Sequence, residues 1–170
     1  PQVEMDPIVR AALVHYQFET AHPFLDGNGR LGRLLITLML INDGVLHSCL
    51  FYPSFQFKKN RSEYYRQLTS VRERGTYEEW IEFFCNSLLE SAKDSVGSLK
   101  NLVDLHNRST ATITENLGRT AANGQRLLGI LEEHPIVDTA FIAAQLDIGR
   151  STASSLVKSF EELGILRPLD

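Results

Sequence analysis

The sequence predicts an all-α protein, and three observations support this prediction. Apolar residues recur at helical spacing along much of the 170-residue chain. Helix-start signals precede these stretches, as where Pro7 follows Asp6 or where Glu79 follows Thr76 at the spacing of a capping box. Helix-ending residues follow them, as at Pro23 and Gly44. We therefore expect a bundle of helices joined by short loops.

The first two helices are expected to enclose a polar loop. The first begins after Asp6 and ends near His22, because the following proline disfavours helical backbone in the residue before it. The second runs from about Arg30 to Ile41. Both are so apolar that we expect them to be buried. The apolar stretch 34–41 is far shorter than the ~20 residues that cross a bilayer, so no membrane partner is expected.

The rest of the chain suggests a core, a linker and a smaller C-terminal module. The Thr76 capping box starts a helix with Trp80, and an amphipathic stretch follows it. Thr, Ala, Asn and Gly then dominate residues 109–124, which indicates a domain boundary near Asn123. Two later helices flank the turn 147–149, a pattern typical of a helix-turn-helix. The predicted helices of this part are residues 125–133, 139–146 and 151–163, and the predicted domains are 1–95, 96–122 and 123–170.

Composition narrows the classes of function. Hydrophobic residues make up 43% and charged residues 22%, as in ordinary folded domains, and the net charge is -4. That balance gives no overall electrostatic reason to bind nucleic acid or an anionic membrane. The two cysteines, Cys49 and Cys85, match no zinc spacing and are too few for a disulfide scaffold. A reducing compartment, the cytoplasm, is therefore expected.

The loop between the first two helices has the chemistry of a phosphate site. Arg30 and Arg33 lie near the start of a helix, where the macrodipole disfavours cations unless an anion is bound there. Gly27 and Gly29 allow positive φ and a close approach of the backbone to a ligand. Asp26 offers a hard oxygen ligand that suits Mg²⁺ shared with phosphate. The sequence thus predicts a site for a phosphate-bearing polyanion and a metal ion.

A candidate general base stands at the edge of the same loop. His22 directly precedes the proline that ends the first helix. Histidine ordinarily titrates near pH ~6.5, which suits proton transfer at neutral pH. Taken alone, a histidine at a helix end is more often structural, and the neighbouring phosphate-site residues favour a catalytic role.

These residues carry a family resemblance. The segment HPFLDGNGRLGR, residues 22–33, matches every fixed position of the Fic-family motif H-x-F-x-D/E-G-N-G-R-x-x-R. The flanking apolar helices, the segment RSEYY at 61–65 and the Trp80 helix also resemble the Fic core. The tail resembles a winged helix-turn-helix that follows this core in many Fic proteins, with the wing incomplete. The resemblance implies an all-α, Fic-type helical bundle in about the first half of the chain.

The resemblance implies protein AMPylation, the transfer of AMP from ATP to a Tyr, Ser or Thr hydroxyl of a target protein. His22 would deprotonate that hydroxyl, and Asp26 would hold Mg²⁺ on the nucleotide phosphates. Phe24 would anchor the loop in the core, and Tyr64 and Tyr65 would lie near the nucleoside. The expected phosphate contacts are Gly27, Asn28, Gly29, Arg30 and Arg33.

Departures from the family pattern leave alternatives open. Fic proteins carry a β-hairpin flap upstream of the motif that aligns the target, and the chain begins too late to contain it, so we expect a piece of a longer protein. Alternative functions are removal of AMP, transfer of another phosphate-linked group, or a DNA-binding regulator with a nucleotide-sensing pocket. Residues 123–170 carry a net charge of -3, which makes DNA binding doubtful and favours a protein-interaction or homodimerisation module.

Overall fold

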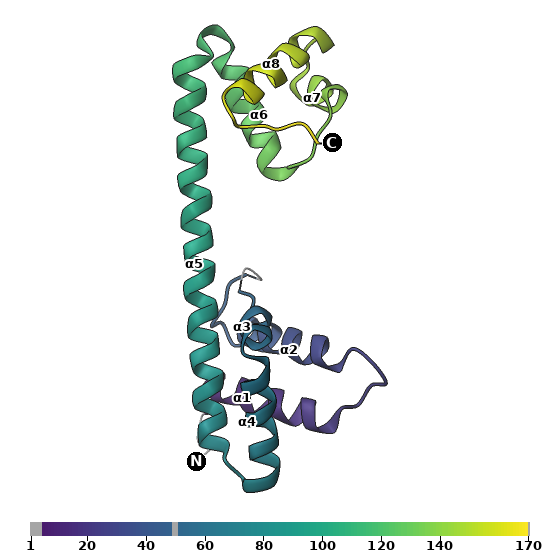
Figure 1. Ribbon diagram of the computed structural model, residues 1–170, viewed down its shortest axis with the longest axis vertical. Coiled ribbons are helices and arrows are strands. Elements are labelled where there is room, and N and C mark those ends of the chain that lie inside the picture. Colours follow the sequence, from purple (N-terminus) through teal and green to yellow (C-terminus); the bar gives the residue numbers. More distant parts are fainter. Residues whose placement is uncertain (1–4, 49–50, 170) are drawn as a thin grey trace. The chain divides into compact units, whose positions relative to one another are not determined.

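The computed structural model describes residues 5–48 and 51–169, and these residues form helices and loops without a strand. The all-α prediction is therefore confirmed for the described residues. The chain divides into two compact units, Pro1–Leu99 and Lys100–Asp170 (Figure 1). The helices are α1 (Pro7–Ala21), α2 (Asn28–Asn42), α3 (Ser54–Lys59), α4 (Arg61–Arg74), α5 (Tyr77–Asn116), the 3₁₀ turn η1 (Gly118–Thr120), α6 (Ala121–Glu133), α7 (Thr139–Leu146) and α8 (Arg150–Glu162).

The core of the first unit forms around Trp80 and Phe84 of α5, both fully buried. The indole Nε1 of Trp80 donates a hydrogen bond to the carbonyl of Ala12 in α1, 2.9 Å away. Buried aliphatic side chains of α2 and α4 complete the cluster. The indole thus fixes α1 against α5, and α1 carries the start of the candidate site.

The ends of α1 agree with the sequence prediction. The Asp6 carboxylate accepts hydrogen bonds from the backbone N–H groups of Ile8 and Val9, at 2.8 and 3.3 Å. Such a cap supplies acceptors for helix donors that have no partner within the helix. At the other end His22 adopts a left-handed conformation, with φ 45° and ψ 55°, and turns the chain out of the helix.

The Thr76 capping box correctly predicts where a helix starts, but the Thr76 hydroxyl makes another contact than a capping box implies. α5 begins at the next residue, as expected. The hydroxyl of Thr76, however, lies 2.6 Å from the hydroxyl of Ser70 in α4. The threonine therefore joins the end of α4 to the start of α5.

The prediction that α2 is buried does not hold for one of its faces. Ile36 and Leu40 lie in the core, whereas Leu34 and Leu38 are each about half exposed. Within the described residues, α1 packs on one side of α2, and the face with Leu34 and Leu38 is left about half exposed. High apolar content alone does not tell a buried helix from one with an open apolar face.

The second unit packs the end of α5 against α6, α7 and α8. Ile113 of α5 is fully buried with Leu127 and Phe160. Most of the predicted linker 96–122, from residue 100 onward, thus groups with this unit, because α5 contributes to its core. The composition change at 109–124 corresponds to the end of α5, η1 and the start of α6.

The α7–turn–α8 arrangement lies where the sequence predicts a helix-turn-helix. Asp147 ends α7 in a left-handed conformation with φ 55°, and Gly149 precedes α8. After α8 the backbone N–H groups of Ile165 and Leu166 both donate to the carbonyl of Phe160. The described residues of this tail are not in a strand, so a wing stays a prediction.

Candidate functional site

The predicted phosphate loop connects α1 to α2. His22 ends α1, and Gly27, at φ 83°, precedes α2. That conformation favours glycine, so a side chain at position 27 would introduce strain. The backbone N–H groups at the start of α2 have no acceptors one turn earlier in the helix. The loop therefore brings a histidine and a helix N-terminus into one short segment.

Asn28 holds the loop in shape. Its side chain is buried, its Oδ1 accepts from the backbone N–H of Phe24 at 2.9 Å, and its Nδ2 donates to the carbonyl of Phe24 at 2.5 Å. Both ends of the amide are thus engaged within the loop. A contact between Asn28 and phosphate would come from its main chain, while its side chain closes the loop.

The prediction that Phe24 anchors the loop in the core is wrong. Its ring is 52% exposed and lies 6.4 Å from the ring of Phe18, centroid to centroid. The neighbouring Leu25 is also exposed. The Asn28 hydrogen bonds to the backbone of Phe24 do the anchoring instead.

Asp26 and Arg30 lie on the outer side of the loop. Oδ1 of Asp26 accepts from the N–H of Gly27 at 2.6 Å, and Oδ2 lies 3.6 Å from the Arg30 guanidinium. Both side chains are largely exposed. Mg²⁺ in nucleotide sites is commonly held by one or two carboxylates, with phosphate oxygens and waters as its other ligands. A single exposed carboxylate beside the predicted phosphate site fits that pattern.

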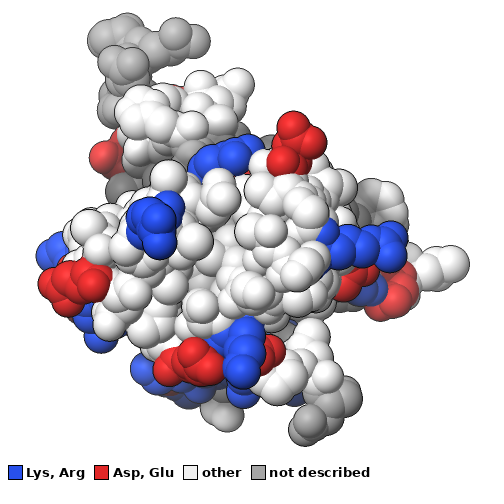
Figure 2. All heavy atoms as spheres, turned by 90° about the horizontal axis from the view of Figure 1, so that it is seen from above, with Lys and Arg blue, Asp and Glu red and all other residues white. Residues whose placement is uncertain are grey.

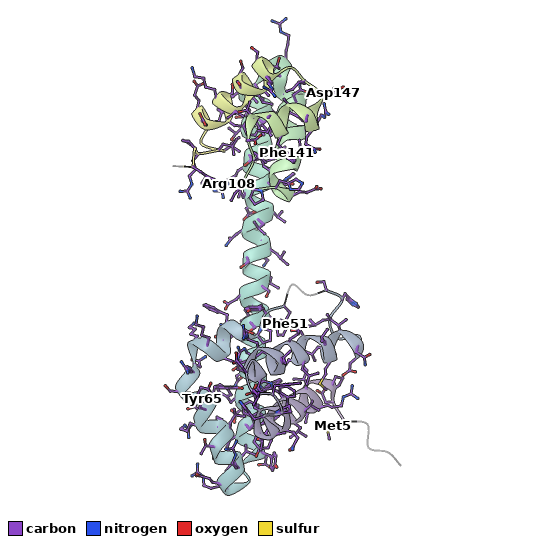
Figure 3. The ribbon with its side chains drawn as sticks, turned by 90° about the vertical axis from the view of Figure 1, so that its right-hand side faces the viewer. Met5, Phe51, Tyr65, Arg108, Phe141 and Asp147 are labelled. Carbon is purple, nitrogen blue, oxygen red and sulfur yellow. The ribbon has the colours of Figure 1, made fainter. Side chains whose placement is uncertain are left out.

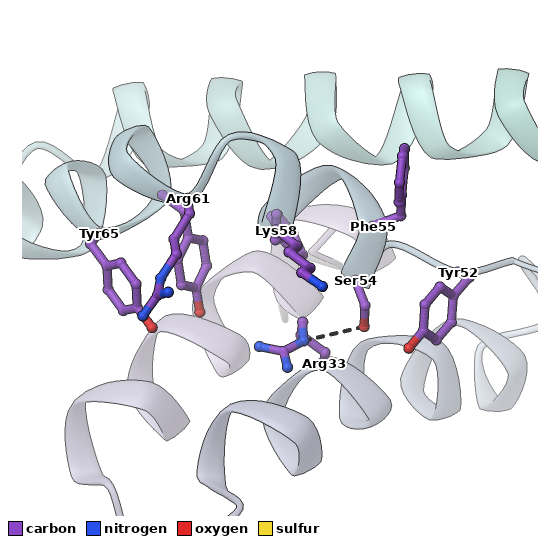
Figure 4. Close-up of a pocket in the computed structure, with 9 residues that line it drawn as sticks. Arg33, Tyr52, Ser54, Phe55, Lys58, Arg61 and Tyr65 are labelled. Atoms are coloured by element: carbon purple, nitrogen blue, oxygen red, sulfur yellow. Dashed lines mark hydrogen bonds between the residues drawn. The ribbon is translucent and has the colours of Figure 1, made fainter.

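Arg33 extends from α2 into a pocket of about 520 Å³ (Figure 4). Its Nε donates to the hydroxyl of Ser54, 3.2 Å away at the start of α3. The described residues that line the pocket include three cations, several aromatic rings and no carboxylate: Arg33, Tyr52, Ser54, Phe55, Phe57, Lys58, Arg61, Tyr64 and Tyr65. Such a lining suits a polyanion that carries an aromatic base.

The second glycine of the motif differs from its predicted role. Gly29 lies within α2 with ordinary helical backbone, so positive φ is not what it provides. A Cβ at position 29 would stand 3.1 Å from Nη1 of Arg33. The glycine therefore leaves room for the guanidinium to lie over the first turn of the helix.

The two candidate tyrosines have different environments. Tyr64 is buried, whereas Tyr65 is 52% exposed at the edge of the unit (Figure 3). The guanidinium carbon of Arg61 lies 5.6 Å from the centre of the Tyr65 ring, within cation–π range. Both tyrosines line the Arg33 pocket, and Tyr65 is the one with an accessible ring face.

His15 of α1, which lies outside the motif, is a buried residue that supports the site. Its buried ring lies 3.0 Å from the carbonyl of Gly32 through Nδ1 and 3.0 Å from the Tyr64 hydroxyl through Nε2. A carbonyl only accepts, so Nδ1 carries the proton and Nε2 accepts from Tyr64. Burial lowers the pKa of His15 to about 4, despite the hydrogen bond to Gly32. A lone histidine on an apolar helix face gives no sequence signal for this role.

Glu19 places a second titratable group under the motif. Its Oε1 is buried and has no hydrogen-bond partner among the described residues, and a Cβ on Gly32 would lie 2.5 Å from this oxygen. Burial raises the pKa of Glu19, although Arg33 and His22 oppose the shift. Gly32 thus allows α1 and α2 to approach closely beneath the loop.

Comparisons with known proteins point to one family. Residues 2–40 match the model of the Fic/DOC family. Protein adenylyltransferase fic-1 of Caenorhabditis briggsae is 35% identical over 96 residues, which are 56% of this chain and 18% of that protein. The Caenorhabditis elegans protein of the same name is 34% identical over 100 residues, 59% of this chain and 18% of its own length. Protein adenylyltransferase Fic of Drosophila ananassae is 37% identical over 82 residues, 48% of this chain and 15% of its own. The chain thus spans less than a fifth of the length of these relatives.

Proposed function

We infer that this chain, a member of the Fic family by residues 2–40, is part of a protein adenylyltransferase that transfers AMP from ATP to a hydroxyl of a protein target. The observation that carries the proposal is that His22, at the end of α1, lies six residues before the N-terminus of α2, which Gly27 caps. This pairing puts a proton acceptor beside a phosphate-binding backbone.

The proposed reaction is an in-line displacement at the α-phosphorus. The target hydroxyl oxygen forms a bond to that phosphorus, and the bond to the bridging oxygen of the β-phosphate breaks. Pyrophosphate leaves with the bonding electron pair, and the hydroxyl proton passes to His22. The backbone N–H groups at Asn28 and Gly29 would face the developing charge on the phosphate oxygens, and the N–H of Gly27 would join them once it leaves the Asp26 carboxylate.

The cationic side chains are proposed to bind the outer phosphates. Arg30 is exposed at the loop, and Arg33 reaches into the pocket with Lys58 and Arg61. Asp26 would hold Mg²⁺, which would neutralise phosphate charge when bound. Tyr65 and Arg61 offer a surface on which the base can stack, while Tyr64 supports that wall from within the core.

We place the protein in the cytoplasm. Cys85 forms no disulfide among the described residues, Cys49 lies outside them, and two cysteines are too few for a disulfide scaffold, which favours a reducing compartment. Among the described helices, none has both the length and the apolar character of a membrane span.

The C-terminal unit is proposed to bind protein, either the target or a second copy of the chain.

Labelled ATP tests the proposed reaction directly. The full-length protein is incubated with labelled ATP, Mg²⁺ and a cell lysate, and adducts are identified by intact mass. We expect a protein target to gain the mass of an AMP group. Transfer of phosphate or another group, or removal of AMP from a modified target, would replace AMPylation by one of the alternatives.

A further inference from the structure

Arg33 makes a hydrogen bond to a residue that lies outside the motif, Ser54. Ser54 begins α3, 21 residues after Arg33, and its hydroxyl accepts a hydrogen bond from Nε of the arginine at 3.2 Å (Figure 4). The contact is partly buried at the wall of the pocket. It connects the phosphate-site helix α2 to the opposite wall formed by α3.

The choice of nitrogen determines what remains free. A guanidinium carries five N–H donors, one on Nε and four on the two terminal nitrogens. Because Ser54 takes the Nε donor, both terminal nitrogens stay available for the paired contacts that arginine makes with phosphate. A contact to Nη1 or Nη2 would instead have used part of that pair.

The missing side chain at position 29 provides the space in which the guanidinium lies. Nη1 passes over Gly29 so closely that a Cβ there would be 3.1 Å away. The hydrogen bond to Ser54 thus restrains a side chain that is otherwise among the most flexible. An arginine ordered before the ligand arrives loses less conformational entropy on binding.

We propose that Ser54 is a positioning residue for Arg33, aiming its terminal nitrogens at the outer phosphates of a nucleoside triphosphate. The inference rests on the proposed function for the identity of the ligand. It goes beyond the Fic motif, because it assigns a part of the triphosphate recognition to α3.

Binding measurements separate positioning from a general structural role. MgATP and AMP are titrated by calorimetry into this chain and its Ser54→Ala, Ser54→Thr and Ser98→Ala variants. Because a hydrogen bond of this kind is worth about 1 kcal/mol, we expect Ser54→Ala to weaken ATP roughly 2–10-fold and AMP less than ~2-fold. Ser54→Thr keeps the hydroxyl and should restore ATP affinity. Ser98, exposed on α5, is the matched control and should have no effect.

A double-mutant cycle shows whether Ser54 acts through Arg33. In an Arg33→Ala background, Ser54→Ala should change ATP affinity by less than ~2-fold, because the side chain it positions is gone. The same loss in both backgrounds would overturn the proposal, and so would equal losses for ATP and AMP. If the unaltered chain binds neither nucleotide, the proposed function fails instead.

The contact itself is measurable without a nucleotide. The Arg33 Nε–H proton in an NMR spectrum of the ligand-free chain should exchange slowly and should exchange faster in Ser54→Ala. An Arg33 Nε–H signal that is the same in both proteins would overturn the positioning role, whatever the outcome with ATP.

Discussion

The hydroxyl of Tyr64 donates a hydrogen bond to Nε2 of His15 across 3.0 Å, inside the core of the first unit. The same imidazole donates through Nδ1 to the carbonyl of Gly32 in α2, which lies between Arg30 and Arg33 in the sequence. One neutral ring thus ties α1 to α2 and α4. The Tyr64 hydroxyl is therefore engaged in the core, and the residue also lines the Arg33 pocket.

This bridge predicts a pH dependence of stability. His15 has a pKa of about 4 in the folded chain and 6.5 as a free side chain, so the unfolded chain binds more protons between these values. Stability from this group is complete above pH 6.5 and is lost as the pH falls towards 4, by about 3 kcal/mol. Urea unfolding followed by fluorescence of Trp80, the single tryptophan and part of the same core, should record the loss.

A variant isolates the contribution of the histidine. His15→Asn should be less stable than the unaltered chain at pH 7, and the difference should shrink as the pH approaches 4.5. Glu19 acts in the opposite sense, because its raised pKa makes stability fall as the pH rises through its titration, and it is present in both proteins. A difference that stays constant between pH 7 and pH 4.5 would contradict the assignment of a buried neutral imidazole.

His22 should matter for transfer and little for nucleotide binding. A general base contributes typically ~10²–10⁴-fold to rate, so His22→Ala in the full-length protein should lose transfer by that factor while ATP affinity stays within a few-fold. Transfer is measured as labelled AMP on the target, and ATP affinity is measured by calorimetry with MgATP. Transfer at the unaltered rate would show that another group takes the proton.

The backbone at His22 allows a second, sharper variant. Its φ of 45° is a conformation that glycine adopts at little cost. His22→Gly should therefore preserve the stability of the first unit better than His22→Ala, while both lose transfer alike. If instead transfer followed stability across the two variants, the histidine would be structural.

Arg33 should distinguish nucleotides by their outer phosphates. Arg33→Ala is expected to weaken ATP much more than AMP, because a triphosphate presents charge beyond the α-phosphate for the guanidinium to meet. Loss of a charge-assisted hydrogen bond is worth about 1.5–3 kcal/mol, or roughly 10–150-fold in affinity. Calorimetry with both nucleotides in Mg²⁺ measures the ratio. Equal losses for ATP and AMP would assign Arg33 to the α-phosphate or to the fold.

The loop of the candidate site could be predicted from the sequence, whereas the contacts that hold its side chains in place could not. The positive φ at Gly27 and the helix start after it follow from local turn chemistry, which a sequence displays directly. The contacts of His15 with Tyr64 and of Arg33 with Ser54 join residues 49 and 21 positions apart. Such contacts depend on how helices pack, and no local pattern encodes them. The half-exposed Phe24 has the same explanation, since its environment depends on which helices surround the loop.

The C-terminal unit should bind duplex DNA weakly or not at all. Much of the affinity for DNA comes from counterions released when lysine and arginine neutralise phosphates. Residues 123–170 carry four basic and seven acidic side chains. On α8 the ammonium of Lys158 lies 3.9 Å from the Glu162 carboxylate, which competes with phosphate for it. In the face seen in Figure 2, Lys and Arg side chains stand apart, with Asp or Glu beside several of them.

A salt titration decides between this expectation and the regulator alternative. The full-length protein, which contains the second unit, is titrated with random-sequence duplex DNA at low salt and again at rising salt. Arg150 and the hydroxyl-bearing residues after it lie on α8, so an Arg150→Ala variant serves as the matched comparison. Micromolar binding that falls steeply with salt and weakens in Arg150→Ala would make α8 a recognition helix. Binding that is absent at low salt would leave α8 for protein partners, because its exposed face would then lack the charge that attracts a nucleic acid.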